Sequence, residues 1–436
     1  MSDQGVPAKL SDEYSGRPGE ILARLQSLYP KLIDLSLDRL HALLAKLGHP
    51  ERALPPVIHV AGTNGKGSTC ANLRAIAETG GLRVHVMTSP HLLDVTERFR
   101  LAGKLVSEDA LVAALEEVER INGDAPITVF EVLTAAGFLL FSRIPADLAI
   151  IEVGLGGRLD ATNVIERPIA CAITPIDLDH QAFLGETLAE IAAEKAGIIK
   201  SGVPIVSAVQ LPEAANILRA RAQELNAPFS LLGEDIHFQH TDTGLRYSDA
   251  KGVLELPAPA LRGRHQDANA ALAIATLRAS ALALPAIAWA GIARTTWPAR
   301  LQRLHGKLTK LLPSDWELWL DGGHNPNAGE ALGATLSDWA DRPTHLIVGM
   351  KQSKDAAGFL NPLLTHAATV QAVSEKGQHL ALPVEEIVAS SKGRAIPGPT
   401  IIEALRRLNG PPARVLICGS LYLAGIALQQ DGARID

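Results

Sequence analysis

The chain has 436 residues, 47% hydrophobic and 20% charged, which is enough for about two or three domains with buried cores. A formal net charge of −6 at pH 7 argues against a general affinity for nucleic acid, which normally needs a basic face. The three cysteines, Cys70, Cys171 and Cys418, lie far apart and lack the spacing of a zinc site or a disulfide framework. The N-terminal residues lack the pattern of a signal peptide, and charges or prolines interrupt the longest apolar stretches. We therefore expect a cytoplasmic protein that does not span a membrane.

Helical apolar spacing over residues 19–48 predicts a helical segment before the first strand. Short apolar runs then alternate with longer helical patterns. Strands are expected at 57–61, 84–87, 148–153, 169–174 and 204–207, and helices at 66–79, 108–121, 131–141, 188–199 and 213–225. This alternation predicts a mostly parallel sheet with helices on both faces. Residues 229–256 change to short alternating runs, typical of antiparallel strands at one edge of that domain, and helices are expected at 266–282 and 287–293.

The segment 297–300 and the stretch around Gly306 and Pro313 have the composition of a hinge. A second alternation follows, with strands expected at 318–320, 346–348, 370–373 and 415–417 and helices between them. We therefore predict an α/β protein of two domains. Residues 1–298 form a P-loop-type domain, and residues 299–436 form a smaller, Rossmann-like domain.

A glycine-rich turn with a lysine and a hydroxyl follows the first predicted strand directly. Residues 61–68 read Ala-Gly-Thr-Asn-Gly-Lys-Gly-Ser. Backbone N–H groups of such a turn, and the start of the next helix, bind phosphate; Lys66 neutralises charge and Ser68 can bind Mg²⁺. The pattern departs from G-x-x-x-x-G-K-[ST], because Val60 replaces the first glycine and Gly67 separates the lysine from the hydroxyl. A tight turn without a ligand is the alternative.

Other polar residues follow predicted strands, at the edge where open α/β sheets bind ligands. Ser89 is either a hydroxyl ligand to a metal or a residue of a Ser-Pro turn. Glu152 ends an apolar strand, and three glycines follow it closely. A carboxylate at the end of a strand beside a P-loop commonly orients Mg²⁺. His180 is either a metal ligand or a hydrogen-bonded loop residue, and Lys195 alone would be read as part of a solvated helix face.

Together these segments resemble the folylpolyglutamate synthase and dihydrofolate synthase family, a branch of the ATP-dependent Mur ligase superfamily. The family is similar in carrying glycine after the P-loop lysine. Small departures are Ser36 for Gly, Gly323 where Ala is frequent, and Ala299 where Gly is frequent. The family's motifs occur in order over nearly the whole chain, at 62–68, 89–92 with 97–98, 130–131, 152–163, 179–180, 194–198, 263–266 with 269–270, 298–302, 321–326 and 418–422.

The resemblance implies an enzyme that uses ATP to join L-glutamate to dihydropteroate and to reduced folates through an acyl phosphate. It implies that the nucleotide binds between the two domains. Structural alternatives are a surface arginine for Arg300 and an ordinary strand-end carboxylate for Asp321. The implied ATP contacts are Thr63, Asn64, Gly65, Lys66, Gly67, Ser68, Asn269, Arg300 and Asp321.

The resemblance also implies a pair of Mg²⁺ ions held by Ser68, Ser89, Glu152 and His180. The implied catalytic residues are Lys66, Lys195 and His324, with Lys195 either carbamylated to form a metal ligand or an unmodified structural lysine. The resemblance further implies a set of residues that contact the pterin: Asp34, Leu35, Ser36, Thr128, Val129, Phe130, Glu131, Leu159, Asp160 and Ala161. Burial in the core is the alternative for Leu35, Val129 and Phe130.

Other functions stay open from the sequence. A folylpolyglutamate synthase without the dihydropteroate activity would carry the same motifs. A cell-wall Mur ligase shares the P-loop and lysine but is expected to have a further nucleotide-sugar domain before Val57. An ATP-binding regulatory switch gives no joint role to Glu152, His180 and Asp321. A monomer is expected, because one chain contains both predicted domains.

Overall fold

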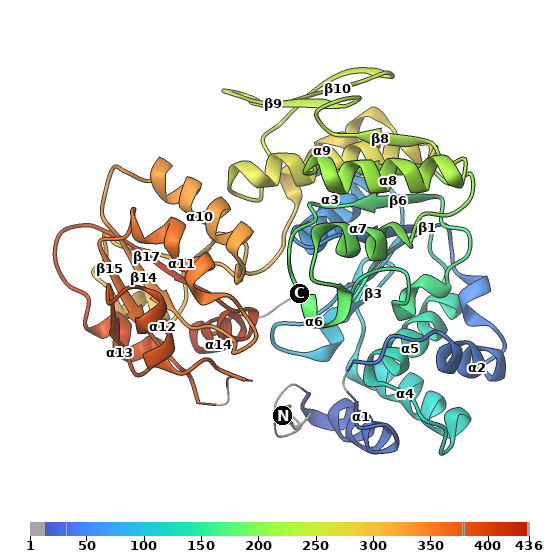
Figure 1. Cartoon of the computed structure of the whole chain (residues 1–436), viewed down its shortest axis with the longest axis horizontal. Helices are drawn as coiled ribbons and strands as arrows, with labels where there is room; N and C mark the ends of the chain where they lie inside the picture. Colours follow the sequence, from blue (N-terminus) through green and yellow to red (C-terminus); the bar gives the residue numbers. More distant parts are fainter. Residues whose placement is uncertain (1–13, 32, 377, 379, 434–436) are drawn as a thin grey trace. The chain divides into compact units, whose positions relative to one another are not determined.

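The computed structural model describes residues 14–31, 33–376, 378 and 380–433, which divide into two compact units (Figure 1). The larger unit comprises residues 14–260 and 266–296, and the smaller unit comprises residues 261–265 and 297–433. The assignment of domains to 1–298 and 299–436 stays a prediction. Among the described residues, no helix is both long enough and apolar enough to cross a membrane.

The larger unit contains an eight-stranded sheet in the order β4-β3-β2-β5-β1-β6-β7-β8. The predicted strands are confirmed to within about one residue at their ends. β3 and β4 were not predicted, because each is too short to show a pattern, and they run antiparallel. The strands are β1 (Val57–Ala61), β2 (Val84–Met87), β3 (Phe99–Leu101), β4 (Lys104–Leu105), β5 (Leu148–Glu152), β6 (Ala170–Ile173), β7 (Ile205–Ser207) and β8 (Phe229–Leu231).

Helices cover both faces of this sheet, as predicted. α3 (Lys66–Thr79), α9 (Arg264–Ala279) and the 3-10 helix η5 (Ala286–Arg294) enclose one apolar cluster. α7 (Leu188–Ala196) and α8 (Pro212–Glu224) enclose a second cluster on the other face. α5 (Val129–Arg143) packs on that second face too, where Phe141 stacks on His85 of β2.

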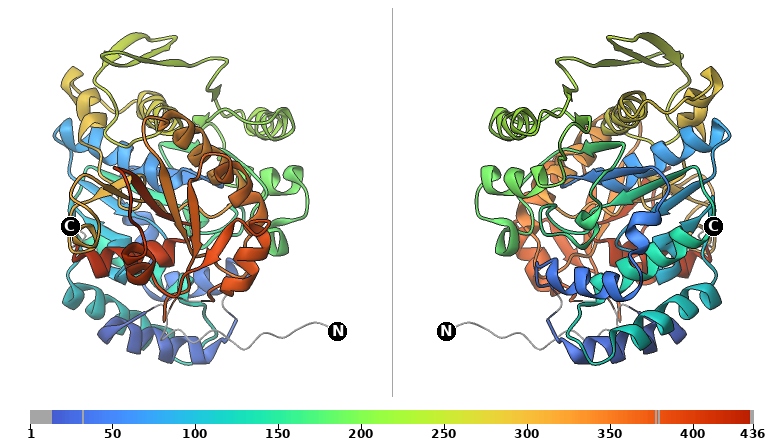
Figure 2. Two further views of the ribbon diagram at one scale, coloured as in Figure 1. Left: turned by 90° about the vertical axis from the view of Figure 1, so that its left-hand side faces the viewer. Right: turned by 90° about the vertical axis from the view of Figure 1, so that its right-hand side faces the viewer.

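Three further helices extend the unit beyond α5. α1 (Gly16–Leu28) contacts α4 (Glu108–Asn122), and α2 (Asp38–Lys46) contacts α4 and α5. Figure 2 shows α1 and α4 side by side, at the opposite end of this unit from the strands β9 and β10. The predicted helical start of the chain is therefore confirmed as two helices.

The antiparallel strands predicted within 229–256 are only partly correct. β9 (His237–Thr241), β10 (Gly244–Asp249) and β11 (Gly252–Leu256) are antiparallel and form a separate three-stranded sheet. β8 instead joins the main sheet parallel to β7. The separate sheet is anchored because Leu245 and Tyr247 of β10 are buried in the apolar cluster shared with α3 and α9.

The smaller unit contains a six-stranded sheet in the order β12-β13-β17-β14-β15-β16. All neighbours are parallel except β12, which pairs antiparallel with β13. Its four predicted strands are confirmed, whereas β12 and β16 were not predicted. The strands are β12 (Gln302–Leu304), β13 (Glu317–Leu320), β14 (Thr344–Val348), β15 (Thr369–Ala372), β16 (Ala395–Pro397) and β17 (Arg414–Cys418).

The helices of the smaller unit also lie on both faces of its sheet. One apolar cluster includes residues of α10 (Pro326–Asp338), α11 (Ala356–Leu364) and α12 (Val384–Ser390). α13 (Ile401–Arg406) and α14 (Leu421–Asp431) both contact the 3-10 helix η6 (Leu308–Leu311). The Rossmann-like prediction for this part is therefore confirmed.

Gly291 allows η5 to lie directly on α3. A Cβ at this position would lie 2.7 Å from both the Ala75 carbonyl carbon and Ile76 Cα. These are helix backbone atoms, which cannot move aside without disturbing α3. We expect Gly291→Ala to lower the free energy of unfolding by about 1–3 kcal/mol, measured by urea denaturation. Ala293→Ser, at an exposed position of η5, is the control and should leave the urea midpoint unchanged.

Candidate functional site

The glycine-rich turn lies where the strand order of the larger unit reverses. β1 lies between β5 and β6, and α3 and α7, which follow β1 and β6, pack on opposite faces. Ligands of open α/β sheets bind at such points. Gly62 and Gly65 have φ values of 140° and 88°, which favour glycine. The Thr63 N–H donates to the Pro175 carbonyl at 2.9 Å, which anchors the turn to the loop after β6.

Two lysine side chains converge on this turn. Lys66 Nζ donates to the carbonyl oxygens of Gly62 at 3.2 Å and Thr63 at 3.3 Å. Lys195 Nζ donates to the same Gly62 oxygen at 2.9 Å. Lys195 is only 4% exposed, so it does not belong to a solvated helix face. Burial, together with the charge of Lys66, lowers the pKa of Lys195 to about 7.

The hydroxyl of Ser68 is buried and has no hydrogen-bond partner among the described residues. A buried polar atom without a partner is unusual and suits a ligand oxygen. Asn269 of α9 lies directly against the turn, because a Cβ at Gly65 would be 2.5 Å from Asn269 Oδ1. The structure therefore brings the predicted ATP contacts 63–68 and Asn269 together.

The predicted metal ligands Ser89 and Glu152 are in contact. Glu152 is the last residue of β5, pairs in register with Val60 of β1 and is 4% exposed. Its Oε2 accepts a hydrogen bond from the Ser89 N–H at 3.1 Å. Both residues therefore lie at the carboxyl edge of the sheet, next to the turn that follows β1. The carboxylate and hydroxyl oxygens of this edge fit a hard divalent cation.

His180 follows β6 and has a side chain that is 46% exposed, with Nε2 3.9 Å from Asp179 Oδ1. Its loop is joined to the turn because Thr63 Oγ1 accepts from the Asp177 N–H at 3.0 Å. Over the described ranges, no three His, Cys, Asp or Glu side chains are arranged to hold a metal ion. The predicted set contains only two residues of these types, Glu152 and His180, and the other two are serines.

The segments predicted to contact a pterin also converge within the larger unit. The Phe130 ring lies against Gly154, where a Cβ would be 2.8 Å from Phe130 Cε1. Leu35 and Leu155 pack on the same apolar cluster. Among the remaining members of this set, Val129 and Ala161 are buried, whereas Ser36 and Leu159 are half-buried. The apolar members are therefore buried or half-buried, and Phe130 lies against the loop that follows β5.

Asp160 is buried and orders the glycine loop that follows β5. Its carboxylate accepts from the N–H groups of Leu155 at 2.8 Å and Thr162 at 2.9 Å. His59 Nε2, in the middle of β1, lies 2.8 Å from Thr162 Oγ1. Burial lowers the pKa of His59 to about 3, so the ring is neutral, and burial raises the pKa of Asp160. His59 was not predicted, although a polar residue in an otherwise apolar strand is a signal that could have identified it.

In the smaller unit, Asp321 follows β13 and orders a turn that includes Arg300. The Asp321 carboxylate accepts from the N–H groups of Leu301 at 2.8 Å and Gly323 at 2.7 Å. Arg300 NH1 donates to the Ala299 carbonyl at 2.8 Å, and Gly322 N donates to the same oxygen at 2.9 Å. Ala299 has a positive φ of 53°, which explains why glycine suits this position.

Two histidines lie in this part of the smaller unit. His324 Nδ1 lies 2.9 Å from the Gly322 carbonyl oxygen. Burial lowers the pKa of His265; the charge of Asp321 opposes that change and the charge of Arg300 adds to it. His265 therefore lies close to Arg300 and Asp321. It belongs to the motif at 263–266, but no role was predicted for it.

Comparison with known proteins decides the family. No family model matches the sequence. The dihydrofolate synthase/folylpolyglutamate synthase of Escherichia coli (strain K12) is 39% identical over 342 residues, covering 78% of this chain and 77% of that protein. The chain belongs to the dihydrofolate synthase/folylpolyglutamate synthase family. The family predicted from the ordered motifs is therefore confirmed.

Solved structures agree with this family and with the α/β fold. E. coli FolC in complex with DHPP and ADP has a TM-score of 0.86 and 34% identity, covering 95% of this chain and 97% of that chain. A bifunctional folylpolyglutamate synthase/dihydrofolate synthase with Mn, AMPPNP and L-glutamate bound has a TM-score of 0.83 and 30% identity, covering 95% and 98%. The first structure contains ADP, and the second contains Mn and AMPPNP.

Ser68→Ala distinguishes a ligand-binding hydroxyl from a structural one. We expect the ligand-free variant to keep its melting temperature, because the buried Ser68 hydroxyl has no partner to lose. We expect it to lose most of the melting-temperature increase that Mg²⁺ with AMPPNP gives the unaltered chain. Ser207→Ala is the control, because it removes a buried hydroxyl that does have a partner: Ser207 Oγ donates to the Ala208 carbonyl at 3.0 Å. This variant should lower the free energy of unfolding of the ligand-free protein by about 1 kcal/mol. A destabilised ligand-free Ser68→Ala would indicate a structural role.

Proposed function

We propose that this member of the family is an ATP-dependent ligase that catalyses two glutamate additions, to dihydropteroate and to reduced folates. The observation that carries the proposal is the convergence of Lys66 and Lys195 on the Gly62 carbonyl, beside Ser89 and Glu152. The positive charge of Lys66 and the oxygen ligands are thereby gathered at one strand edge, as a triphosphate requires. Family membership supplies the substrate class.

The reaction proceeds in two steps. A carboxylate oxygen of the pteroate or folate attacks the γ-phosphorus of ATP, ADP leaves, and an acyl phosphate forms. The α-amino nitrogen of L-glutamate then attacks the acyl carbon, phosphate leaves, and the nitrogen loses a proton to give the amide. Phosphorylation is needed because a free carboxylate is a poor electrophile with a poor leaving group. The protein contributes mainly positioning and electrostatic stabilisation.

The proposed residue roles combine the arrangement of the turn with the roles that the family resemblance implies. The N–H groups of residues 63–68 and Lys66 bind the phosphates, with Lys66 exchanging its loop carbonyls for phosphate oxygens. Asn269, Arg300 and Asp321 bind ATP, and His324 acts near the reacting carbonyl. Ser68, Ser89, Glu152 and His180 hold a pair of Mg²⁺ ions, and the bound Mn of a relative supports a divalent metal. Such ions supply neutralisation of the phosphate charge.

The segments at Asp34–Ser36, Thr128–Glu131 and Leu159–Ala161 bind the pterin ring. The contact of Phe130 with Gly154, and the packing of Leu35 and Leu155 on one apolar cluster, support a pterin site. We propose that this site accepts dihydropteroate as well as folates. A folylpolyglutamate synthase that acts only on folates is the second candidate. We propose a monomer, with ATP, L-glutamate and the pterin or folate as its substrates.

A parallel assay tests the proposed function. We expect ADP release to require L-glutamate and to occur both with dihydropteroate and with tetrahydrofolate monoglutamate. Lys66→Ala should abolish turnover, whereas Lys46→Ala, which alters an exposed lysine at the end of α2, should retain it. Activity with tetrahydrofolate alone would favour the second candidate. ADP release unaffected by either pterin substrate would contradict both.

Lys195 is proposed to be carbamylated, because a neutral amine reacts with CO₂ and the pKa of Lys195 is lowered to about 7. With ¹³C-labelled bicarbonate we expect a protein-bound carbonyl signal that grows as the pH rises through about 7 and the amine loses its proton. The signal should be absent from Lys195→Ala and retained in Lys200→Ala, which alters a nearby lysine in the sequence that is only partly buried. Absence of the signal from the unaltered protein would make Lys195 a structural residue.

A further inference from the structure

One arginine links two of the segments proposed to bind the pterin. Arg39 lies in the first turn of α2, and its NH1 and NH2 donate to Asp34 Oδ2 at 2.8 Å and to the Asp34 carbonyl at 2.9 Å. Its Nε donates to Glu131 Oε2 at 3.1 Å, and NH2 lies 3.1 Å from Glu131 Oε1. A single guanidinium therefore joins Asp34 and Glu131, which lie 5 and 92 positions from Arg39 in the sequence.

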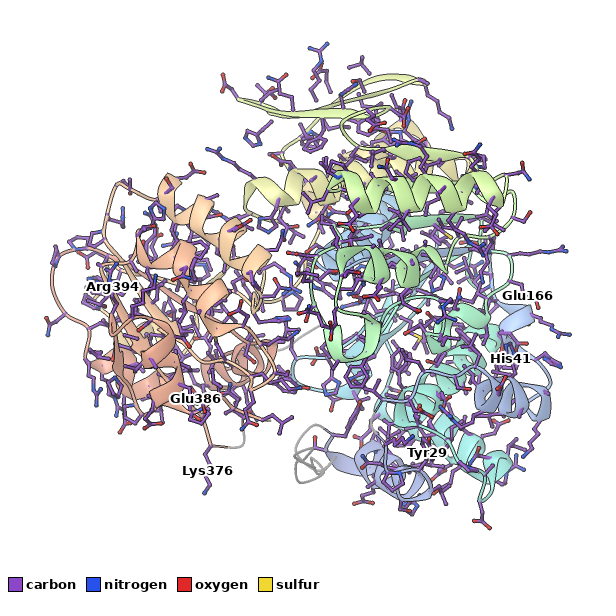
Figure 3. The ribbon with its side chains drawn as sticks, viewed as in Figure 1. Tyr29, His41, Glu166, Lys376, Glu386 and Arg394 are labelled. Carbon is purple, nitrogen blue, oxygen red and sulfur yellow. The ribbon has the colours of Figure 1, made fainter. Side chains whose placement is uncertain are left out.

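The cluster is more than a solvated surface pair. The side chain of Arg39 is 18% exposed and that of Glu131 is 3% exposed. Burial acts to lower the pKa of Arg39, but hydrogen bonding and charge from Glu131 and Asp34 outweigh it, so the pKa is raised. The Tyr29 ring lies under the guanidinium, with 4.9 Å between the ring centroid and Arg39 Cζ. Figure 3 shows Tyr29 among the helices near α1 and α4. Bidentate, partly buried arginine pairs hold geometry far better than exposed ones.

Local helix stability does not account for Arg39. A cation in the first turn of α2 is unfavourable, because the start of a helix carries partial positive charge. The start of α5 is already capped without Arg39, since Thr128 Oγ1 accepts from the Glu131 N–H and Glu131 Oε2 accepts from the Thr128 N–H. The contacts of Arg39 therefore act between segments.

We propose that Arg39 is a positioning residue for the pterin substrate, an inference that rests on the proposed function. Asp34 Oδ2 accepts from both Arg39 and the Tyr29 hydroxyl, which donates at 2.7 Å. Within the described residues, the other oxygen, Oδ1, has a single ionic neighbour, Lys31 Nζ at 3.8 Å. Oδ1 is thereby held to accept hydrogen bonds from the ring N–H and amino groups of a 2-amino-4-oxopteridine.

Arg39 also fixes the second segment through Glu131. Glu131 is one residue after Phe130, whose ring lies against Gly154 beyond the end of β5. Holding Glu131 therefore holds the start of α5 against the strand that ends in Glu152. The substrate class that this arrangement recognises is a planar pteridine with N–H donors on one edge.

Steady-state kinetics of Arg39 variants test this role. We expect Arg39→Met to raise the KM for dihydropteroate at least about tenfold, with the KM for ATP within about twofold of the unaltered enzyme. Arg39→Lys should be intermediate, because one ammonium cannot hold both carboxylates in the same way. Arg24→Met is the matched control, since Arg24 makes two 2.7 Å hydrogen bonds to Glu119 elsewhere on the same unit. It should leave both constants unchanged.

A double-mutant cycle with Asp34→Asn separates positioning from a loss of general stability. If Arg39 acts through Asp34, the combined variant should raise the KM for dihydropteroate less than the product of the two single effects. Independent effects, or equal increases in the KM for ATP and dihydropteroate, would overturn the proposal. Should Arg39→Met lower the melting temperature markedly, Arg39→Lys provides the same comparison. An unaltered enzyme without dihydropteroate activity would instead contradict the proposed function.

Discussion

A single backbone oxygen, the carbonyl of Gly62, organises the end of β1. It accepts hydrogen bonds from Lys66 and from Lys195, which reaches it from α7. Two ammonium groups repel each other, and the shared carbonyl offsets only part of that repulsion. The buried position of Lys195 adds a desolvation penalty, which is why its pKa falls to about 7. A site in this state favours whatever supplies negative charge, whether the phosphates of a nucleotide or a carbamate formed on Lys195 itself.

Glycines, which have no side chain, allow the surrounding segments to approach this strand edge. Thr174 lies against Gly62, Asn269 against Gly65 and Phe130 against Gly154, and a Cβ at any of these glycines would collide with its neighbour. The glycines therefore do more than permit positive φ values, which only the first two of them have. They allow polar and aromatic side chains to pack directly onto loops that must also present N–H groups to a ligand.

The sequence predicted the parts of the site that depend on local patterns. The turn at 62–68 and Glu152 follow apolar strands, so their meeting at one sheet edge follows from the parallel topology. Arg39 and His59 were not predicted, because their partners Glu131 and Thr162 are 92 and 103 residues away and no local pattern shows such pairs. The shortest strands also escaped prediction, since the two residues of β4 carry no periodicity. The parallel pairing of β8 was likewise decided by packing beside β7.

Phosphate-binding turns occur in many kinds of enzyme. The specificity of the proposed site therefore depends on its second half, the segments proposed to bind the pterin. In this chain the proposed metal-binding residues and the proposed pterin segments meet at the end of β5, a strand whose five residues are all buried. Glu152 at its end contacts Ser89, and Gly154, two residues later, receives the Phe130 ring. The separation between the proposed metal-binding carboxylate and the proposed pterin contact is therefore set by the short piece of backbone that leaves the end of this strand. Because only Val153 lies between Glu152 and Gly154, the reacting carboxylate of a bound substrate would be located relative to the phosphates by the end of β5, which is the positioning that acyl phosphate chemistry requires.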